Sequence, residues 1–227
     1  MYEGIAKGLS AAEHDQAWSL EVAAEDPATL VYAYPAALEV GEYGSGGYVA
    51  PVVRLEFGIR NETWPAQEGE IVPYVNAAAP RDLQTVSIRV RALRGERTFW
   101  EKATILHLEA HRVQPRIGAD RLSRHYADLA TLAEHEIGRN ALDRLDLLRH
   151  VAEHKAAYFR TPWARYDEAA AGRLRLVPPA PLEEVLRSDY ARMREMYFTP
   201  PSSFNEILER LRRLEDAIRE RVESASS

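Results

Sequence analysis

The stretch Gly95-Glu96-Arg97-Thr98-Phe99-Trp100-Glu101-Lys102, together with Arg121-Leu122-Ser123-Arg124-His125-Tyr126-Ala127-Asp128-Leu129, decides the fold of this chain. Upstream of it, apolar and polar residues alternate, which is typical of half-buried strands. From Glu96 onward, apolar residues recur every three or four positions, which is typical of amphipathic helices. The pattern therefore predicts a sheet before the stretch and helices from it to the end of the chain.

The alternation is clearest in residues 48–60, where Val53, Leu55 and Phe57 are separated by Arg54, Glu56 and Gly58. One face of this segment is apolar and the other polar, so it is expected to form a half-buried strand. The other elements expected upstream are a short helix at residues 8–23, strands at residues 29–34, 71–75 and 85–93, and a glycine-rich loop at residues 41–47. Together these strands predict a small, mostly antiparallel sheet of three or four strands.

Five helices are expected in the second part of the chain, and Gly138 is expected to stop the second of them. Ser203 and Glu206 have the spacing of a capping box at the start of the last helix. The expected helices cover residues 96–113, 122–133, 142–159, 182–197 and 204–218. The predicted fold class is α+β, a small, mostly antiparallel sheet followed by a C-terminal helical bundle. The predicted division is a sheet region at 1–94, a helical domain at 95–222 and a frayed tail at 223–227.

Composition excludes several classes of protein. Hydrophobic residues make up 46% of the chain and charged residues 28%, the balance of an ordinary globular protein. The chain has no cysteine, which excludes disulfides, thiolate catalysis and cysteine-bound metals. No apolar run approaches the roughly 20 residues of a membrane span, and the N-terminus has no signal-peptide pattern, so we expect a cytoplasmic protein. The net charge of −6 gives no overall attraction to nucleic acid or anionic membranes.

Three charged residues have both a functional and an ordinary interpretation. Lys102, beside an apolar helix stripe, could hold its ammonium at a fixed point for a phosphate, or simply be a surface lysine paired with an acid. Asp128 could point into a cleft near a lysine or a metal-bound phosphate, or form an ion pair with Arg124 one turn earlier. Glu56 would be a metal-ligand candidate if a second layer or a ligand covers its strand face, and a solvated glutamate otherwise. Spacing alone leaves these alternatives open.

Two other patterns favour ordinary structure. His107 and His111 are four residues apart, as are His150 and His154, but neither pair has the glutamate next to its first histidine that a zinc-protease helix uses. Both pairs are interpreted as surface or interface histidines. The Gly-Ser pair within residues 44–47 is followed by Pro51 and a valine-rich segment, which leave no room for a helix, so it is interpreted as a loop.

Several strings occur in a specific order along the chain. They are Val53-Arg54-Leu55-Glu56-Phe57-Gly58-Ile59-Arg60, Arg97-Thr98-Phe99-Trp100-Glu101-Lys102, Arg124-His125-Tyr126-Ala127-Asp128-Leu129, His154-Lys155, Tyr158-Phe159-Arg160, Leu176-Val177-Pro178, Asp189-Tyr190 and Phe204. From about Leu30 to Ile218 this order resembles the AbiEii-type nucleotidyltransferase toxin family. The resemblance implies a polymerase-β-like nucleotidyltransferase that uses Mg²⁺ and an NTP. It also implies a toxin of a toxin–antitoxin or abortive-infection system, with a cognate antitoxin and a tRNA or other RNA acceptor as partners.

The same resemblance implies roles for individual residues. Lys102 would contact the triphosphate, and Asp128 would be the helix-borne acid essential to activity. Glu56 would lie near the metals on a core strand. Arg97 and Arg124 would contact phosphate or RNA. Carboxylates for Mg²⁺ and cations for phosphates are the residue types that nucleotidyl transfer needs.

One family motif is not found: a Gly-Gly or Gly-Ser turn that opens a helix and leads to paired carboxylates on a strand. It is expected upstream of Leu30, where Asp26 precedes a proline and has no acid two positions away. We therefore expect this chain to be incomplete as an enzyme and inactive by itself. The alternative function is a non-catalytic interaction module that binds an antitoxin or RNA.

Overall fold

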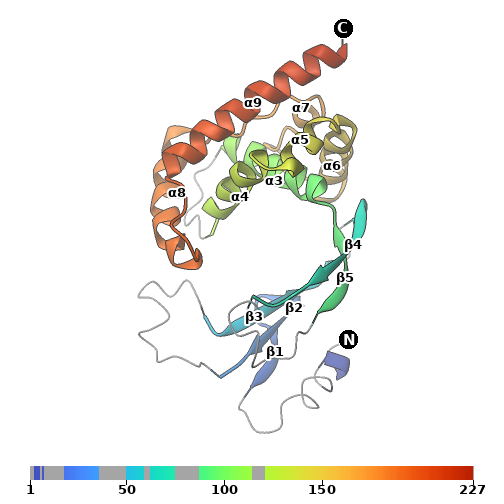
Figure 1. Cartoon of the computed structure of the whole chain (residues 1–227), viewed down its shortest axis with the longest axis vertical. Helices are drawn as coiled ribbons and strands as arrows, with labels where there is room; N and C mark the ends of the chain where they lie inside the picture. Colours follow the sequence, from blue (N-terminus) through green and yellow to red (C-terminus); the bar gives the residue numbers. More distant parts are fainter. Residues whose placement is uncertain are drawn as a thin grey trace. The chain divides into compact units, whose positions relative to one another are not determined.

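The computed structural model describes residues 3–5, 7, 18–35, 50–58, 62–74, 87–113 and 121–226 (Figure 1). The chain divides into two compact units, residues 1–62 with 192–200, and residues 63–191 with 201–227. Strands and helices occur in both the order and the proportions of an α+β protein, which confirms the predicted fold class. No helix in the described part of the chain is long and apolar enough to cross a membrane.

The first unit contains an antiparallel sheet of β1 (Ser19–Ala23), β2 (Asp26–Ala33) and β3 (Val52–Glu56), in that order. Leu30 of β2 pairs with Leu55 of β3, and Leu20 and Leu30 are buried. The strand predicted at residues 29–34 is confirmed in β2, and the strand predicted at residues 48–60 is confirmed in its central part, which is β3. The helix predicted at residues 8–23 is wrong for β1, because pairing with β2 fixes that segment as a strand. Residues 8–17 and the loop at 41–47 lie outside the described residues.

A separate two-stranded antiparallel sheet belongs to the second unit and consists of β4 (Ala66–Ile71) and β5 (Ile88–Leu93). The strand predicted at residues 71–75 is wrong in position, since β4 ends at Ile71. The sequence of β4 is mostly polar, so its hydrophobic pattern does not reveal it. Its charges show why it pairs: Glu68 lies opposite Arg91 and Glu70 opposite Arg89, and opposite charges on paired strands stabilise the pairing. The single predicted sheet is therefore two sheets.

Helices make up most of the second unit (Figure 1). They are α3 (Gly95–Ala110), α4 (Ser123–Ala133), α5 (Glu136–Leu142), α6 (Leu145–Tyr158), α7 (Tyr166–Ala170), α8 (Ala180–Met193) and α9 (Phe204–Ser226). The end of α8 and a 3-10 turn (Arg194–Met196) belong to the first unit. Helix α3 is central, because it contacts α4, α5, α6 and α7. Its apolar stripe of Phe99, Trp100, Ala103 and Leu106 is completely buried. The period of 3.6 residues in the sequence therefore identifies the core helix correctly.

Three helix boundaries bear on the predictions. The capping box is confirmed: the Ser203 N–H donates to Glu206 Oε2 at 2.7 Å, and the Glu206 N–H donates to Ser203 Oγ at 3.3 Å. The tail predicted to fray from Glu223 is helical through Ser226. Gly138 does not stop the second helix, because α4 ends at Ala133 and Gly138 lies inside α5.

A glycine is required at position 138 because α5 approaches the end of α4 closely. A Cβ at this position would lie 2.6 Å from the Leu132 carbonyl oxygen and 2.7 Å from the Ala133 Cα. Alanine is the better helix former, so without this contact Gly138→Ala would stabilise the protein. We expect the clash to dominate and to lower the free energy of unfolding by about 1–3 kcal/mol in chemical denaturation.

The matched control is Gly69→Ala in β4, where the nearest atom to a new Cβ is the Val90 carbonyl oxygen at 4.0 Å. This variant should stay within about 0.5 kcal/mol of the parent chain. A Gly138→Ala protein as stable as the parent would show that α4 and α5 do not pack as described.

Candidate functional site

Lys102 and Asp128 form an ion pair between α3 and α4. The Lys102 Nζ lies 2.6 Å from Asp128 Oδ2, and the two side chains are 19% and 45% exposed. The lysine stem is covered by the core while the carboxylate still reaches solvent. This arrangement fixes the ammonium at the protein surface without enclosing it, as a site for an anionic ligand requires.

His125 lies on α4 beside this pair, with its Nδ1 3.4 Å from Lys102 Nζ. Burial and the neighbouring Lys102 charge lower the pKa of His125 to about 4. The ring is therefore neutral at physiological pH, and a proton on Nε2 leaves Nδ1 as an acceptor facing the lysine. The positive charges of Arg124 and Lys155 also act on His125, which places both near the pair.

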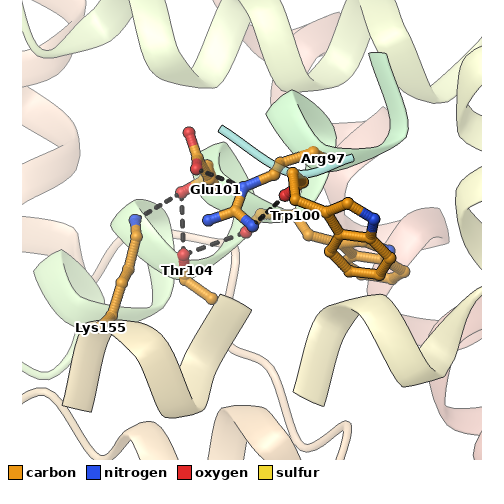
Figure 2. Close-up of polar contacts among 6 residues, drawn as sticks. Arg97, Trp100, Glu101, Thr104 and Lys155 are labelled. Atoms are coloured by element: carbon orange, nitrogen blue, oxygen red, sulfur yellow. Dashed lines mark hydrogen bonds and ion pairs between the residues drawn. The ribbon is translucent and has the colours of Figure 1, made fainter. Parts of the chain in front are cut away.

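Lys155 of α6 is the second lysine of this cluster. Its Nζ donates to the Glu101 carbonyl at 2.9 Å, and that carbonyl also accepts from Thr104 Oγ1 (Figure 2). Burial lowers the pKa of Lys155 to about 8; the Glu101 carboxylate opposes this effect and the Arg97 charge adds to it. The ammonium is therefore mostly charged at neutral pH but loses its proton far more easily than a surface lysine.

Lysine is rare in this chain, yet it occupies both of these positions. The chain contains three lysines, Lys7, Lys102 and Lys155, against 26 arginines among its 29 basic residues. Two of the three lysines thus belong to one cluster, whereas the exposed ion pairs of the described residues use arginine. A lysine offers a compact point charge that suits a phosphate oxygen, while an arginine presents a broad planar fork.

The start of α4 is fixed by a buried carboxylate from α8. Asp189, which is 0% exposed, accepts from the Arg121 N–H at 3.0 Å, from the Ser123 N–H at 2.8 Å and from Ser123 Oγ at 2.6 Å. A carboxylate at a helix N-terminus satisfies N–H groups that the helix leaves unpaired and favours the helix dipole. Asp189 thereby sets the position of the helix that carries His125 and Asp128.

Arg97 was predicted to contact phosphate or RNA, but its guanidinium is 1% exposed and bonded within the protein. Its Nε donates to Glu101 Oε1 at 2.9 Å (Figure 2). Its Nη1 donates to the Trp64 carbonyl. These contacts favour a positioning role for Arg97. Arg124 is exposed on α4 one turn before Asp128, as a phosphate contact requires. The phosphate roles of both arginines stay predictions.

Glu56 lies at the end of β3 in the first unit, opposite Thr29 of β2, and is exposed. Lys102, Asp128, Arg97 and Arg124 all belong to the second unit. The structure thus brings Lys102 and Asp128 into contact with each other, and the metal role of Glu56 stays a prediction.

A different cluster, His107, His111 and Glu168, has ligand atoms within 4.8 Å of one another. However, His107 Nδ1 accepts from the Arg175 N–H at 3.0 Å, and His107 Nε2 lies 3.1 Å from the Arg165 carbonyl. Burial lowers the pKa of His107 to about 4, so a neutral ring fits both backbone contacts. The cluster serves structure. The surface or interface interpretation of this pair is wrong, because His107 is completely buried within the unit.

Around Asp128 the described residues form no group of three histidines and carboxylates close enough to share an ion. Mg²⁺ prefers an octahedron of oxygen ligands, of which Asp128 offers one or two. The described part of this cluster therefore does not complete a metal site.

Sequence reasoning did not assign Lys155, His125 or Asp189 to the site. All three lie within strings that carry the family resemblance, which is the one signal that could have identified them. Each of them contacts a residue that is at least 23 positions away in the sequence, so no local period reveals them.

Comparison with known proteins gives one match. The family model described as "Nucleotidyl transferase AbiEii toxin, Type IV TA system" matches residues 4–210 of the chain. Neither the curated proteins nor the solved structures contain a match.

Proposed function

Since the chain belongs to the AbiEii nucleotidyl transferase toxin family of type IV toxin–antitoxin systems, we propose that its Lys102–Asp128 cluster binds the triphosphate of an NTP for transfer to an RNA acceptor. The observation that carries the proposal is the 2.6 Å ion pair between two residues 26 positions apart. It holds one of the three lysines of the chain at a partly open surface. A cognate antitoxin and a cytoplasmic location are proposed with it.

Each residue of the cluster has a proposed role. Lys102 contacts a phosphate oxygen, and Asp128 holds the ammonium in place by accepting a hydrogen bond from it at one carboxylate oxygen. Lys155 adds a second positive charge, and the neutral ring of His125 accepts from Lys102 without adding repulsion. Preorganised cations of this kind stabilise the charge that develops on a departing pyrophosphate. When bound, Mg²⁺ would neutralise phosphate charge and polarise the phosphoryl group.

Nucleotide binding tests the first half of the proposal. We expect the 227-residue chain to bind Mg²⁺ with a non-hydrolysable NTP analogue in isothermal titration calorimetry. Lys102→Ala should weaken this affinity at least about tenfold, because a charged hydrogen bond to phosphate is lost. Asp128→Asn should weaken it less, because the lysine remains but is no longer held by a charge. Lys7→Ala is the matched control, since Lys7 is exposed in the other unit.

Equal affinities for the parent chain, Lys102→Ala and Lys7→Ala would contradict the placement of the triphosphate at this cluster. A melting temperature measured for each variant separates a lost contact from a lost fold.

The affinity for the nucleotide should also depend on pH through Lys155. The pKa of Lys155 is lowered to about 8, so its charge is present below that pH and is lost as the pH rises through it. We expect the dissociation constant to increase about tenfold between about pH 7 and about pH 9.5. In Lys155→Arg the charge persists over this range, and the dependence should flatten. A parent chain with constant affinity over the same range would exclude Lys155 from the site.

Transfer is a separate step with its own assay, incubation of the chain with α-labelled NTPs, Mg²⁺ and tRNA. We keep the expectation that the chain alone incorporates no label, because the described donors around Asp128 do not complete a metal site. Incorporation that disappears in Asp128→Asn would contradict this expectation and support the site. A chain that binds RNA or an antitoxin but no nucleotide would instead favour the non-catalytic interaction module.

A further inference from the structure

A row of aromatic rings follows one side of α6. Its members, here called the aromatic ladder, are Trp64, His150, His154, Tyr158 and Phe159. The Trp64 and His150 ring centroids lie 5.3 Å apart, edge to face. Those of His154 and Tyr158 lie 4.7 Å apart, and those of His154 and Phe159 lie 6.3 Å apart.

Three members of the ladder follow one side of α6, at the margin of its buried side. Residues 150, 154 and 158 are spaced by four, which stacks their side chains along one side of a helix. The core-facing side of α6 is formed by other residues, Leu147, Leu148, Val151 and Ala152. Tyr158 and Phe159 are nevertheless exposed, and His150 and His154 are half-buried.

Three rings of the ladder are far more exposed than aromatic rings packed in a core. Trp64 is 50% exposed, Tyr158 55% and Phe159 41%. Leaving three large rings partly in water forgoes hydrophobic stabilisation, and such adjacent exposed rings commonly mark a binding surface. The main chain of Trp64 is also fixed, because its carbonyl accepts a hydrogen bond from the buried Arg97. The contacts of Arg97 thus position a ladder residue.

The ladder is connected to the Lys102–Asp128 cluster through α6. His154 directly precedes Lys155, whose ammonium reaches the Glu101 carbonyl on α3, next to Lys102. Exposed arginines flank the ladder on α6 and just beyond it, Arg149 before His150 and Arg160 after Phe159. Aromatic faces interleaved with cations are the combination that binds single-stranded nucleic acid, where bases stack on rings and cations contact phosphates.

We propose that the aromatic ladder binds the single-stranded end of an RNA by base stacking and leads that end toward the Lys102–Asp128 cluster. The inference rests on the proposed function for the identity of the RNA as acceptor. Single-stranded RNA is favoured over a protein partner because the exposed Arg149 and Arg160 flank the rings. It is favoured over duplex RNA because paired bases do not expose their faces to side chains.

Fluorescence polarisation with a labelled single-stranded RNA of about 12 nucleotides tests the ladder on the full chain. We expect binding to the single strand and much weaker binding to a duplex of the same length. Tyr158→Leu, which keeps apolar volume but removes the ring face, should weaken binding at least about fivefold, whereas Tyr158→Phe should retain it. Tyr74→Leu is the matched control, an 84% exposed tyrosine of the same unit outside the ladder.

Nucleotide binding measured on the same variants separates the two proposals. Tyr158→Leu should bind the Mg²⁺–NTP analogue like the parent chain, and Lys102→Ala should still bind the RNA within a fewfold of the parent. RNA binding unchanged in Tyr158→Leu and Phe159→Leu, or equal for single strand and duplex, would overturn the ladder and leave the nucleotide site standing. RNA binding through the ladder by a chain that binds no nucleotide would instead overturn the proposed function alone.

Discussion

Four polar side chains of helix α3, which is buried on several sides, find partners within the protein, and these contacts shape the second unit. Helix α3 carries Arg97, Lys102, Thr104 and His107 among completely buried apolar residues. A buried polar group without a partner costs roughly 1–3 kcal/mol. Each of these four is bonded: Arg97 to Glu101 and the Trp64 carbonyl, Lys102 to Asp128, Thr104 to main-chain carbonyls, and His107 to main-chain groups beside α7.

These pairings also determine where the neighbouring elements lie, so the candidate site follows from the core. Satisfying Lys102 requires α4 at a defined distance, and Asp189 of α8 holds the start of that helix. The Glu101 carbonyl brings Lys155 of α6 beside the same region. The partly open cluster of two lysines, a carboxylate and a neutral histidine is thus built from contacts that also stabilise the unit. Variants of the site consequently need a stability measurement beside every binding measurement.

The sequence predicts elements well where a period extends over several turns, as in α3, α4 and α9, and where a capping box marks a start. It fails for β1, where pairing with β2 decides the state of the segment, and for β4, whose mostly polar sequence has no hydrophobic alternation. For the site, spacing left Lys102 and Asp128 ambiguous, and the family resemblance put them in one site. Lys155 and Asp189 depend on contacts between distant segments, which no local pattern contains.

The central claim is that a nucleoside triphosphate binds at Lys102 and Lys155, and the small number of lysines makes it directly observable. A chain labelled with ¹³C at lysine Cε should give three signals, which single Lys→Arg variants assign to Lys7, Lys102 and Lys155. On titration with Mg²⁺ and an NTP analogue, the Lys102 and Lys155 signals should shift together while the Lys7 signal stays fixed. Unchanged Lys102 and Lys155 signals at saturating nucleotide would contradict this claim.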